Sequence, residues 1–296
     1  LSAASMEVGG RSQPLPIRQT DPSGAFTLWS DTVLRVRLRD TDGFNGAPPA
    51  GIEFHAVPDT APDVRIEQPA TDQDVVADAS VPLHVTAADD HGLHRLWIAH
   101  RPGSSAAPPA SPLVLAEGGP TQRGLDARAR WNLEGLSLRT GDVVVYRAEA
   151  DDFDNLRGPH TGQSAEQRLR VIDRAEMERR LADGWAEWDQ QLAAVIKEQA
   201  AVRAALHAAR SPAELAEAER RQRDLAPRAG ELAGRVGELA EMARTNHLAA
   251  AATIARQEQA GSALAEIAQH PMPEAADRIH DSGAQPEKRA QAEALQ

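Results

Sequence analysis

The sequence predicts a multidomain chain in which an all-β part precedes an all-α part. The β part is expected to be an Ig-like β-sandwich preceded by a partial one, and the α part an antiparallel helical hairpin or coiled coil. Two observations predict this fold class. Up to Asp173, short segments of alternating polar and apolar residues are separated by turns rich in Asp, Gly and Pro. After Asp173, alanine, glutamate, arginine and leucine dominate, and apolar residues recur in heptads.

Residues 1–59 are expected to be a partial Ig-like β domain that contains only C-terminal strands. Within it, LRVRLRDTDGFNGAPPAGIEFHAVPD at Leu34–Asp59 has the layout of YRAEADDFDNLRGPHTGQSAEQRLRVID at Tyr146–Asp173. Each copy has a strand, an acidic turn with Asn, a Gly/Pro loop, a second strand and a closing Asp. This repeat predicts the last two strands of two tandem sandwich domains. The first copy is too short to bury a complete core.

Residues 60–173 are expected to form the complete Ig-like β-sandwich domain. Val64 and Ile66 alternate with Arg65 and Glu67, which is the period of a strand. Trp97 and Trp131 lie in apolar strands, where core packing is the expected role and ligand stacking the alternative. Further strands are predicted at 80–87, 93–100, 128–133, 142–150 and 166–172.

Residues 174–270 are expected to form the helical hairpin or coiled-coil region. Asp173, with Glu176 three residues on, is a candidate cap for a first helix that reaches about Ala209. Apolar residues spaced alternately by four and three form a seam that needs a partner helix. We assign helix-seam interaction to Leu181, Trp185, Trp188, Leu192, Val195, Val202 and Leu206.

A second helix is predicted directly after the first. Ser211-Pro212-Ala213-Glu214 has the pattern of a capping box, and the helix should reach about Asn246. Folding back at Ser211 sets Gln199 against Gln222, so we expect their amides to hydrogen-bond each other. A third, alanine-rich helix is predicted at 247–269, and 271–296 is expected to be a linker and the start of a further helix.

The composition excludes several classes of partner and site. A net charge of −12 argues against binding to nucleic acid or to an anionic lipid surface. The chain has no cysteine, which removes disulfides and thiolate chemistry. No apolar run is long enough to span a membrane. Because the chain begins at Leu1 without a leader segment, we expect any membrane anchor to lie outside this segment.

Two clusters of polar residues are candidates for chemistry. Oxygen-rich loops between sandwich strands can hold Ca²⁺, although Asp, Asn and Gly are also the residues that tight turns need. The Ca²⁺ candidates are Asp89, Asp90, Asp151, Asp152, Asp154 and Asn155. The four histidines within His84–His100 have no recognisable metal-ligand spacing. Motifs of nucleophilic or phosphate-transfer enzymes are absent, so we expect neither an enzyme nor an obligatory cofactor.

Two stretches resemble a known type of protein. VPDTAPDVRIEQPATDQDVVADASVPLHVTAADDHGL resembles the start, and GDVVVYRAEADDFDNLRGPHTGQSAEQRLRVID the end, of an Ig-like domain. Such domains occur in large, mostly uncharacterised bacterial cell-envelope proteins of planctomycete type, where a long helical coiled-coil region follows them. The resemblance implies an extracytoplasmic or periplasmic location at a bacterial membrane and implies no catalytic residues.

The expected function is therefore a non-enzymatic structural and interaction segment of an envelope-associated protein. Its Ig-like modules would present a helical assembly region to protein partners or to further copies of the chain. The alternative is an adhesion-type Ig module that binds Ca²⁺ or glycan.

Overall fold

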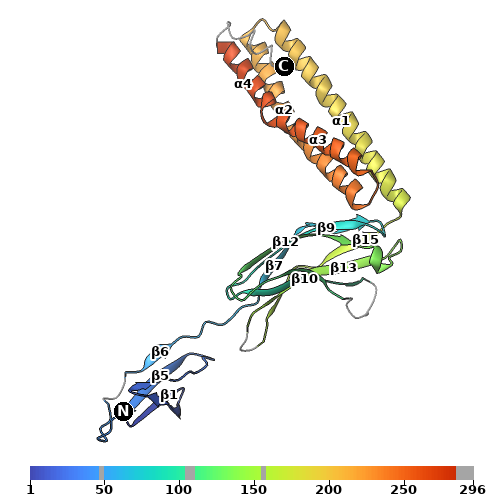
Figure 1. Cartoon of the computed structure of the whole chain (residues 1–296). Helices are drawn as coiled ribbons and strands as arrows, with labels where there is room; N and C mark the ends of the chain where they lie inside the picture. The colour runs from blue at the N-terminus through green and yellow to red at the C-terminus, as the bar shows by residue number, and fades with distance from the viewer. Residues whose placement is uncertain (47–49, 104–110, 155–157, 285–296) are drawn as a thin grey trace. The chain divides into compact units, whose positions relative to one another are not determined.

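A computed structural model describes residues 1–46, 50–103, 111–154 and 158–284. The chain divides into two compact units, Leu1–Thr60 and Ala61–Gln296. The first is an antiparallel β unit. The second contains a β-sandwich followed by packed helices, as the alternating and heptad patterns predicted (Figure 1).

The N-terminal unit is built on one antiparallel sheet of four strands in the order β2-β1-β5-β6. These strands are β1 (Ala3–Val8), β2 (Arg11–Pro14), β5 (Thr32–Arg39) and β6 (Ile52–Phe54), and a short hairpin adds β3 (Ile17–Arg18) and β4 (Asp21–Pro22). Ala4 and Met6 are its buried apolar residues among those described. The repeated segment at Leu34–Asp59 supplies the antiparallel pair of β5 and β6, in which Leu34 lies opposite Ile52.

The sandwich in the second unit consists of two sheets. One has the order β11-β10-β13-β15-β8, with β14 added beside β13, and the other has the order β12-β9-β7. Strand β8 pairs in parallel with β15, while the other strand pairs are antiparallel. The strands are β7 (Asp63–Gln68), β8 (Gln73–Val75), β9 (Ser80–Ala88), β10 (Leu93–Pro102), β11 (Leu113–Glu117), β12 (Gly124–Asn132), β13 (Val143–Asp152), β14 (Thr161–Gln163) and β15 (Gln167–Val171).

The sandwich core comes from the alternation that predicted the strands. In β9, Val81, Leu83, Val85 and Ala87 are buried, and the residues between them are more exposed. Trp131 belongs to the core cluster, where its ring contacts that of Tyr146 at 5.5 Å between centroids. Trp97 is also buried, but the guanidinium of Arg95 lies over its ring at 4.5 Å.

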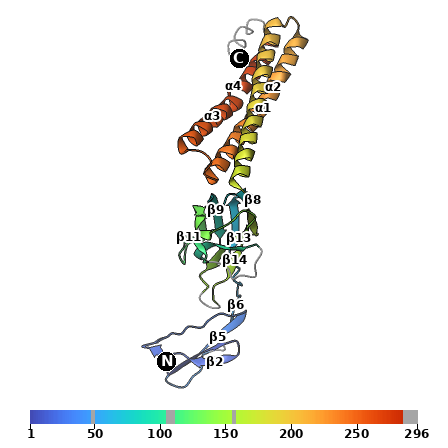
Figure 2. The ribbon, with the colours of Figure 1, turned by 90° about the vertical axis from the view of Figure 1, so that its right-hand side faces the viewer.

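Within the described residues, four α-helices follow the sandwich: α1 (Arg174–Ala208), α2 (Pro212–Thr245), α3 (Ala251–Gln269) and α4 (Pro271–Ala284). Helix α2 packs against each of the other three, so it is the central helix of the bundle (Figure 2). The predicted capping box is present, since Ser211 Oγ accepts from Glu214 N and Glu214 Oε2 accepts from Ser211 N. At the start of α1, Asp173 occupies the predicted N-cap position but makes no side-chain cap hydrogen bond, and Glu176 pairs with Arg180.

The α1–α2 hairpin has the antiparallel register that the two seams predicted. Leu206 and Leu215 pack in one cluster, and Leu192 and Ala229 in another. Glu198 and Arg221 form a 2.7 Å ion pair between the two helices. The expected hydrogen bond between Gln199 and Gln222 does not form: neither side-chain polar atom of Gln222, nor Oε1 of Gln199, has a partner among the described residues.

The C-terminal part differs from the expected linker. Residues 271–284 form α4, although this segment begins with Pro271 and Pro273. Both prolines fall in the first turn, where backbone N–H groups have no partner within the helix and proline is tolerated. Met272, Ala275, Ala276 and Ile279 are buried at helical spacing, so packing against the bundle stabilises this short helix.

Candidate functional sites

The two acidic loops of the second unit lie side by side because of how β10 pairs with β13. Leu93, at the start of β10, lies opposite Asp152, at the end of β13. The turn that precedes Leu93 therefore adjoins the loop that follows Asp152, and Phe153 N donates to Gly92 O at 3.0 Å. Gly92 has φ of +128°, and an added Cβ would lie 2.6 Å from Pro120 O, so the close turn requires glycine.

Asp152 and Asp89 are the inner carboxylates of these loops. Asp152 is 1% exposed; its Oδ1 accepts from Asp154 N at 3.0 Å and His160 N at 2.9 Å, and its Oδ2 lies 3.1 Å from His160 Nδ1. Asp89 Oδ2 accepts from His91 N and Gly92 N, both at 2.8 Å. These bonds organise two tight turns, as the structural alternative for Asp-rich loops expects.

The carboxylate oxygens that these turns leave available are the ones that could bind a cation. Asp89 Oδ1 is buried without a hydrogen-bond partner among the described residues. The nearest carboxylate oxygens of Asp89 and Asp152 lie within 4.8 Å of each other, and Asp154 Oδ2 lies 4.0 Å from His160 Nδ1. Three of the predicted Ca²⁺ candidates, Asp89, Asp152 and Asp154, thus belong to one neighbourhood. His160 belongs to it as well, although the sequence did not single it out.

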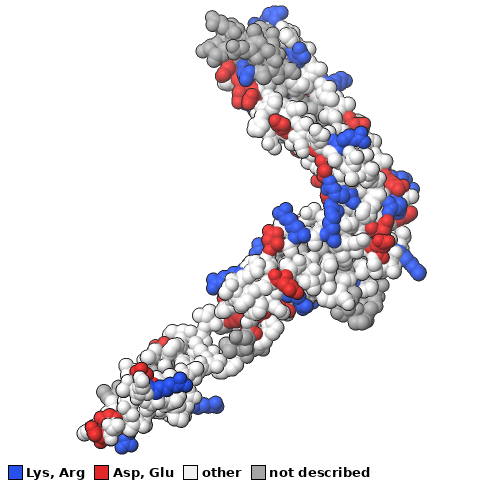
Figure 3. Space-filling view, viewed as in Figure 1, with Lys and Arg blue, Asp and Glu red and all other residues white. Residues whose placement is uncertain are grey.

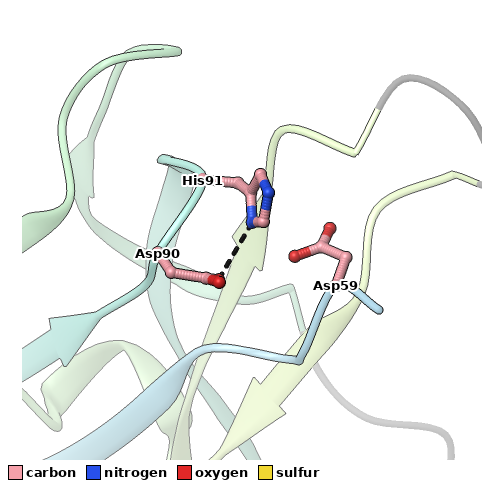
Figure 4. Close-up of side chains that lie close together, drawn as sticks. All are labelled: Asp59, Asp90 and His91. Atoms are coloured by element: carbon pink, nitrogen blue, oxygen red, sulfur yellow. Dashed lines mark ion pairs between the residues drawn. The ribbon is translucent and has the colours of Figure 1, made fainter. Parts of the chain in front are cut away.

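The other predicted Ca²⁺ candidates have different surroundings. Asp90 is exposed and pairs with His91 Nδ1 at 3.0 Å, as the dashed line in Figure 4 marks. The hydrogen bond from His91 lowers the pKa of the Asp90 carboxyl. Asp151 accepts from Thr161 Oγ1 at 2.8 Å and lies 3.8 Å from Arg95. Asn155 lies outside the described residues.

The histidines of the segment His84–His100 have separate partners. His84 pairs with Asp126 at 3.0 Å, and His91 with Asp90. The rings of His94 and Phe153 are in contact at 5.1 Å between centroids, and those of His100 and Trp131 at 5.0 Å. These four histidines therefore contact different residues and do not converge on one site.

The helix-seam residues pack inside the bundle. Leu181, Val195, Val202 and Leu206 are buried, whereas Trp185, Trp188 and Leu192 are partly buried. Trp188 Nε1 donates to Leu232 O in α2 at 2.9 Å. The indole rings of Trp185 and Trp188 meet edge to face, with 5.9 Å between their centroids. A gap of about 300 Å³ beside them is lined by α2 and α3, including Val236 and Thr253. Helix α2 is thus the partner of the first seam within the chain.

A further site, which the sequence did not predict, lies where the helices meet the sandwich. Asn246, the residue after α2, is 1% exposed; its Oδ1 accepts from Val76 N at 2.9 Å, and its Nδ2 donates to Met242 O at 2.9 Å. Val75 O accepts from Ile172 N, which shows that β8 pairs with β15 along one edge. Val76 N points from the opposite edge, so Asn246 satisfies a donor of this edge strand.

Ion pairs surround this contact, which we call the joint. The carboxylate of Asp74 in β8 accepts from Arg170 at 2.7 and 2.6 Å and from Arg180 of α1 at 2.7 Å. These arginines, Arg170 first, lower the pKa of Asp74. Its stabilising contribution is therefore present above the pKa of an unfolded aspartate and is lost as the pH falls through the lowered value.

Two more ion pairs and an apolar contact complete the joint. Arg174 pairs with Asp78 at 2.8 Å, and Arg130 of β12 with Glu241 of α2 at 3.2 Å. Met177 belongs to the sandwich core cluster, and Met242 packs against it. A cleft of about 790 Å³ lies beside these residues. Figure 3 shows basic and acidic side chains intermixed over this region.

Comparison of the chain with protein-family models and with curated proteins finds no match. None of the described helices is long and apolar enough to cross a membrane.

Proposed function

We propose that this chain is a non-enzymatic structural and interaction segment of an envelope-associated protein, in which an Ig-like module holds a helical bundle in a fixed orientation. The observation that carries the proposal is the buried hydrogen bond between Asn246 and Val76. Breaking it would leave the buried N–H of Val76 and the buried Oδ1 of Asn246 without partners, at a cost of about 1–3 kcal/mol for each group. The envelope location rests on the sequence resemblance.

The attachment of the helices at two points supports a rigid connection. Helix α1 continues directly from β15 through Ile172 and Asp173, whereas α2 returns to the sandwich 72 residues after Arg174, at Asn246. A single covalent connection would permit rotation about the linker. A second attachment, through buried and ion-paired groups, opposes that rotation.

The use of polar groups at the joint supports a structural role. Asp74, Arg170, Arg180 and Glu241 border the cleft at the joint, and all four are engaged in ion pairs across or beside the joint. Exposed ion pairs contribute little individually, but a network around a buried hydrogen bond adds directional specificity. Protein partners, or further copies of the chain, would then meet a bundle whose direction is set by the sandwich.

Cooperative unfolding of the second unit tests this proposal. Far-UV circular dichroism follows the helices, and ¹⁹F NMR of chain labelled with fluorotyrosine follows the sandwich core, because Tyr146 is the only tyrosine in the sequence. In the full chain we expect the two signals to change at one midpoint, because the sandwich and bundle stabilise each other. Asn246→Ala should lower the midpoint and separate the two transitions. Gln163→Ala, which removes an exposed amide on β14, should change neither. Two separate transitions in the unaltered chain would contradict the proposal.

A second candidate function is cation binding at the acidic loops. The observation in its favour is the unpartnered, buried Oδ1 of Asp89 close to the carboxylate of Asp152. Two carboxylates at this separation repel each other unless a proton or a cation lies nearby. Asp89, Asp152 and Asp154 would supply oxygen ligands, which Ca²⁺ prefers.

Thermal melting in a calcium titration tests this candidate. A ligand that binds only the folded state at one hundred times its Kd stabilises that state by about 2.7 kcal/mol. We expect Ca²⁺ to raise the melting temperature, and Asp89→Asn to abolish the increase. Asp151→Asn is the matched control, because Asp151 belongs to the same acidic run but is engaged with Thr161 and Arg95. An unchanged melting temperature at millimolar Ca²⁺ would exclude the cation.

A further inference from the structure

His100 occupies a core position of the sandwich where the opposed residues are aromatic. It lies in β10 directly opposite Tyr146 of β13, and it is 7% exposed. The His100 ring meets that of Trp131, on the facing sheet, at 5.0 Å between centroids. Trp131 in turn contacts Tyr146. The imidazole is therefore part of an aromatic cluster between the two sheets.

Neither nitrogen of the His100 ring has a hydrogen-bond partner among the described residues. A neutral imidazole has one donor and one acceptor, and a protonated imidazole has two donors and a positive charge. Burying the neutral ring without partners is costly, but burying the charged ring without partners is far more so. The site therefore accepts histidine only in its neutral form.

The charged groups around His100 offer no compensation for a positive charge. A cavity of about 140 Å³ beside the ring is lined by Arg101, Arg147 and Glu166, among others. Glu166 pairs with Arg101 at 3.2 Å, and Arg147 pairs with Glu149 at 2.6 Å.

The neighbouring aromatic groups also offer no negative charge. The phenol of Tyr146 donates to Gln167 at 2.7 Å. Burial, and after it the charge of Asp72, raises the pKa of Tyr146, so the phenol stays neutral. Asp72 itself accepts a hydrogen bond from Arg168 N at 2.8 Å. Trp131, from the facing sheet, is uncharged. Burial alone lowers the pKa of His100.

We propose that His100 makes the sandwich acid-sensitive, because the unfolded chain takes up a proton at this residue that the folded core refuses. The sign follows from linkage. As the pH falls below about 6.5, the ordinary pKa of histidine, the unfolded state binds the proton and the folded state does not, so unfolding becomes more favourable. The folding equilibrium constant should fall by up to about tenfold per pH unit until the lowered pKa of the folded state is reached. This device goes beyond the proposed structural role and does not depend on it.

Urea unfolding of the full chain at pH 7.5 and pH 5.5 tests the proposal. We expect the folding equilibrium constant of the unaltered chain to fall by up to about tenfold between these values, since only the part of the interval below about pH 6.5 contributes. His100→Phe should remove most of this fall, because phenylalanine fills the site without titrating. His94→Phe is the matched control, since His94 is an exposed residue of the same strand, and it should retain the fall. An equal fall in the chain with His100→Phe would overturn the proposal.

If His100→Phe does not fold, an NMR titration of the unaltered chain tests the proposal instead. The imidazole resonance of His100, followed by NMR, should remain that of a neutral ring from pH 7.5 down to 5.5 in the folded protein. A resonance that titrates at pH 6.5 or above, with the fold intact, would show that the core accepts the charge and would overturn the proposal.

Discussion

Gln199 and Gln222 are the polar positions of the two helix seams, and the bundle buries Gln222 without using its hydrogen-bonding capacity. Gln222 is 0% exposed, and both of its side-chain polar atoms lack partners among the described residues. A buried amide in that state costs about 1–3 kcal/mol relative to an apolar residue of similar size. The benefit that offsets this cost in coiled coils is register, because a polar position disfavours slipped pairings.

Gln222→Leu should therefore stabilise the chain by about 1 kcal/mol or more, measured as the free energy of unfolding in urea. Leucine is close to glutamine in volume and leaves no polar atom buried. Gln190→Leu, at an exposed position of α1, is the control and should change the free energy by less than about 0.5 kcal/mol. A loss of stability with Gln222→Leu would show that the amide has a partner, such as a bound water.

Spacing alone located these two residues opposite each other, but it could not show which hydrogen bonds their amides make. That depends on side-chain torsions and on the separation of the helices. The same limit applies to Asn246. Its partner, Val76, lies 170 positions away in the chain, and nothing in the local sequence of either residue points to the other.

A glycine of α3 lies in close contact with α2. At Gly261 in α3, an added Cβ would lie 2.9 Å from Val236 Cγ1 and 3.1 Å from Val236 Cβ, and Val236 is a stiff, buried residue of α2. At Gly234 in α2, an added Cβ would meet nothing within 4 Å. Both positions are glycines within helices, but Gly261 has no room for a Cβ and Gly234 has open space there.

Alanine at the two glycines should consequently have opposite effects. Gly234→Ala should raise the free energy of unfolding by about 1 kcal/mol through helix propensity. Gly261→Ala should lower it, because the contact with Val236 forces α2 and α3 apart or distorts a rotamer. Chemical denaturation of both variants measures the difference. Equal stabilisation by both would mean that α3 does not pack against α2 at this point.

Elements with a strong period were predictable, and short elements were not. The alternation at 80–87 and the heptads at 181–206 correspond to β9 and α1. Strands β8 and β14 are three residues each, too short for an alternating pattern to be recognised. Helix α4 was not predicted because its prolines suggest a break, whereas their position in the first turn is compatible with a helix.

At the scale of the whole molecule, we propose that the joint makes the sandwich and the helical bundle of the second unit one body. The sequence indicated that Asp89 and Asp90 could adjoin the acidic loop at 151–155, but it could not show which of the two approaches Asp152. Asp89 does so, and its approach depends on the pairing of β10 with β13. Recognition of protein partners, self-association and location at the envelope remain proposals that rest on this architecture and on the sequence resemblance.

The central claim, that sandwich and bundle are rigidly joined, is tested most directly by a distance distribution between two spin labels. The chain contains no cysteine, so Arg128→Cys in β12 and Lys197→Cys in α1 place one label on each part without competing sites. Both positions are exposed. We predict one narrow distribution in this doubly labelled chain and a broad one after the further change Asn246→Ala. A broad distribution before that change would contradict the account.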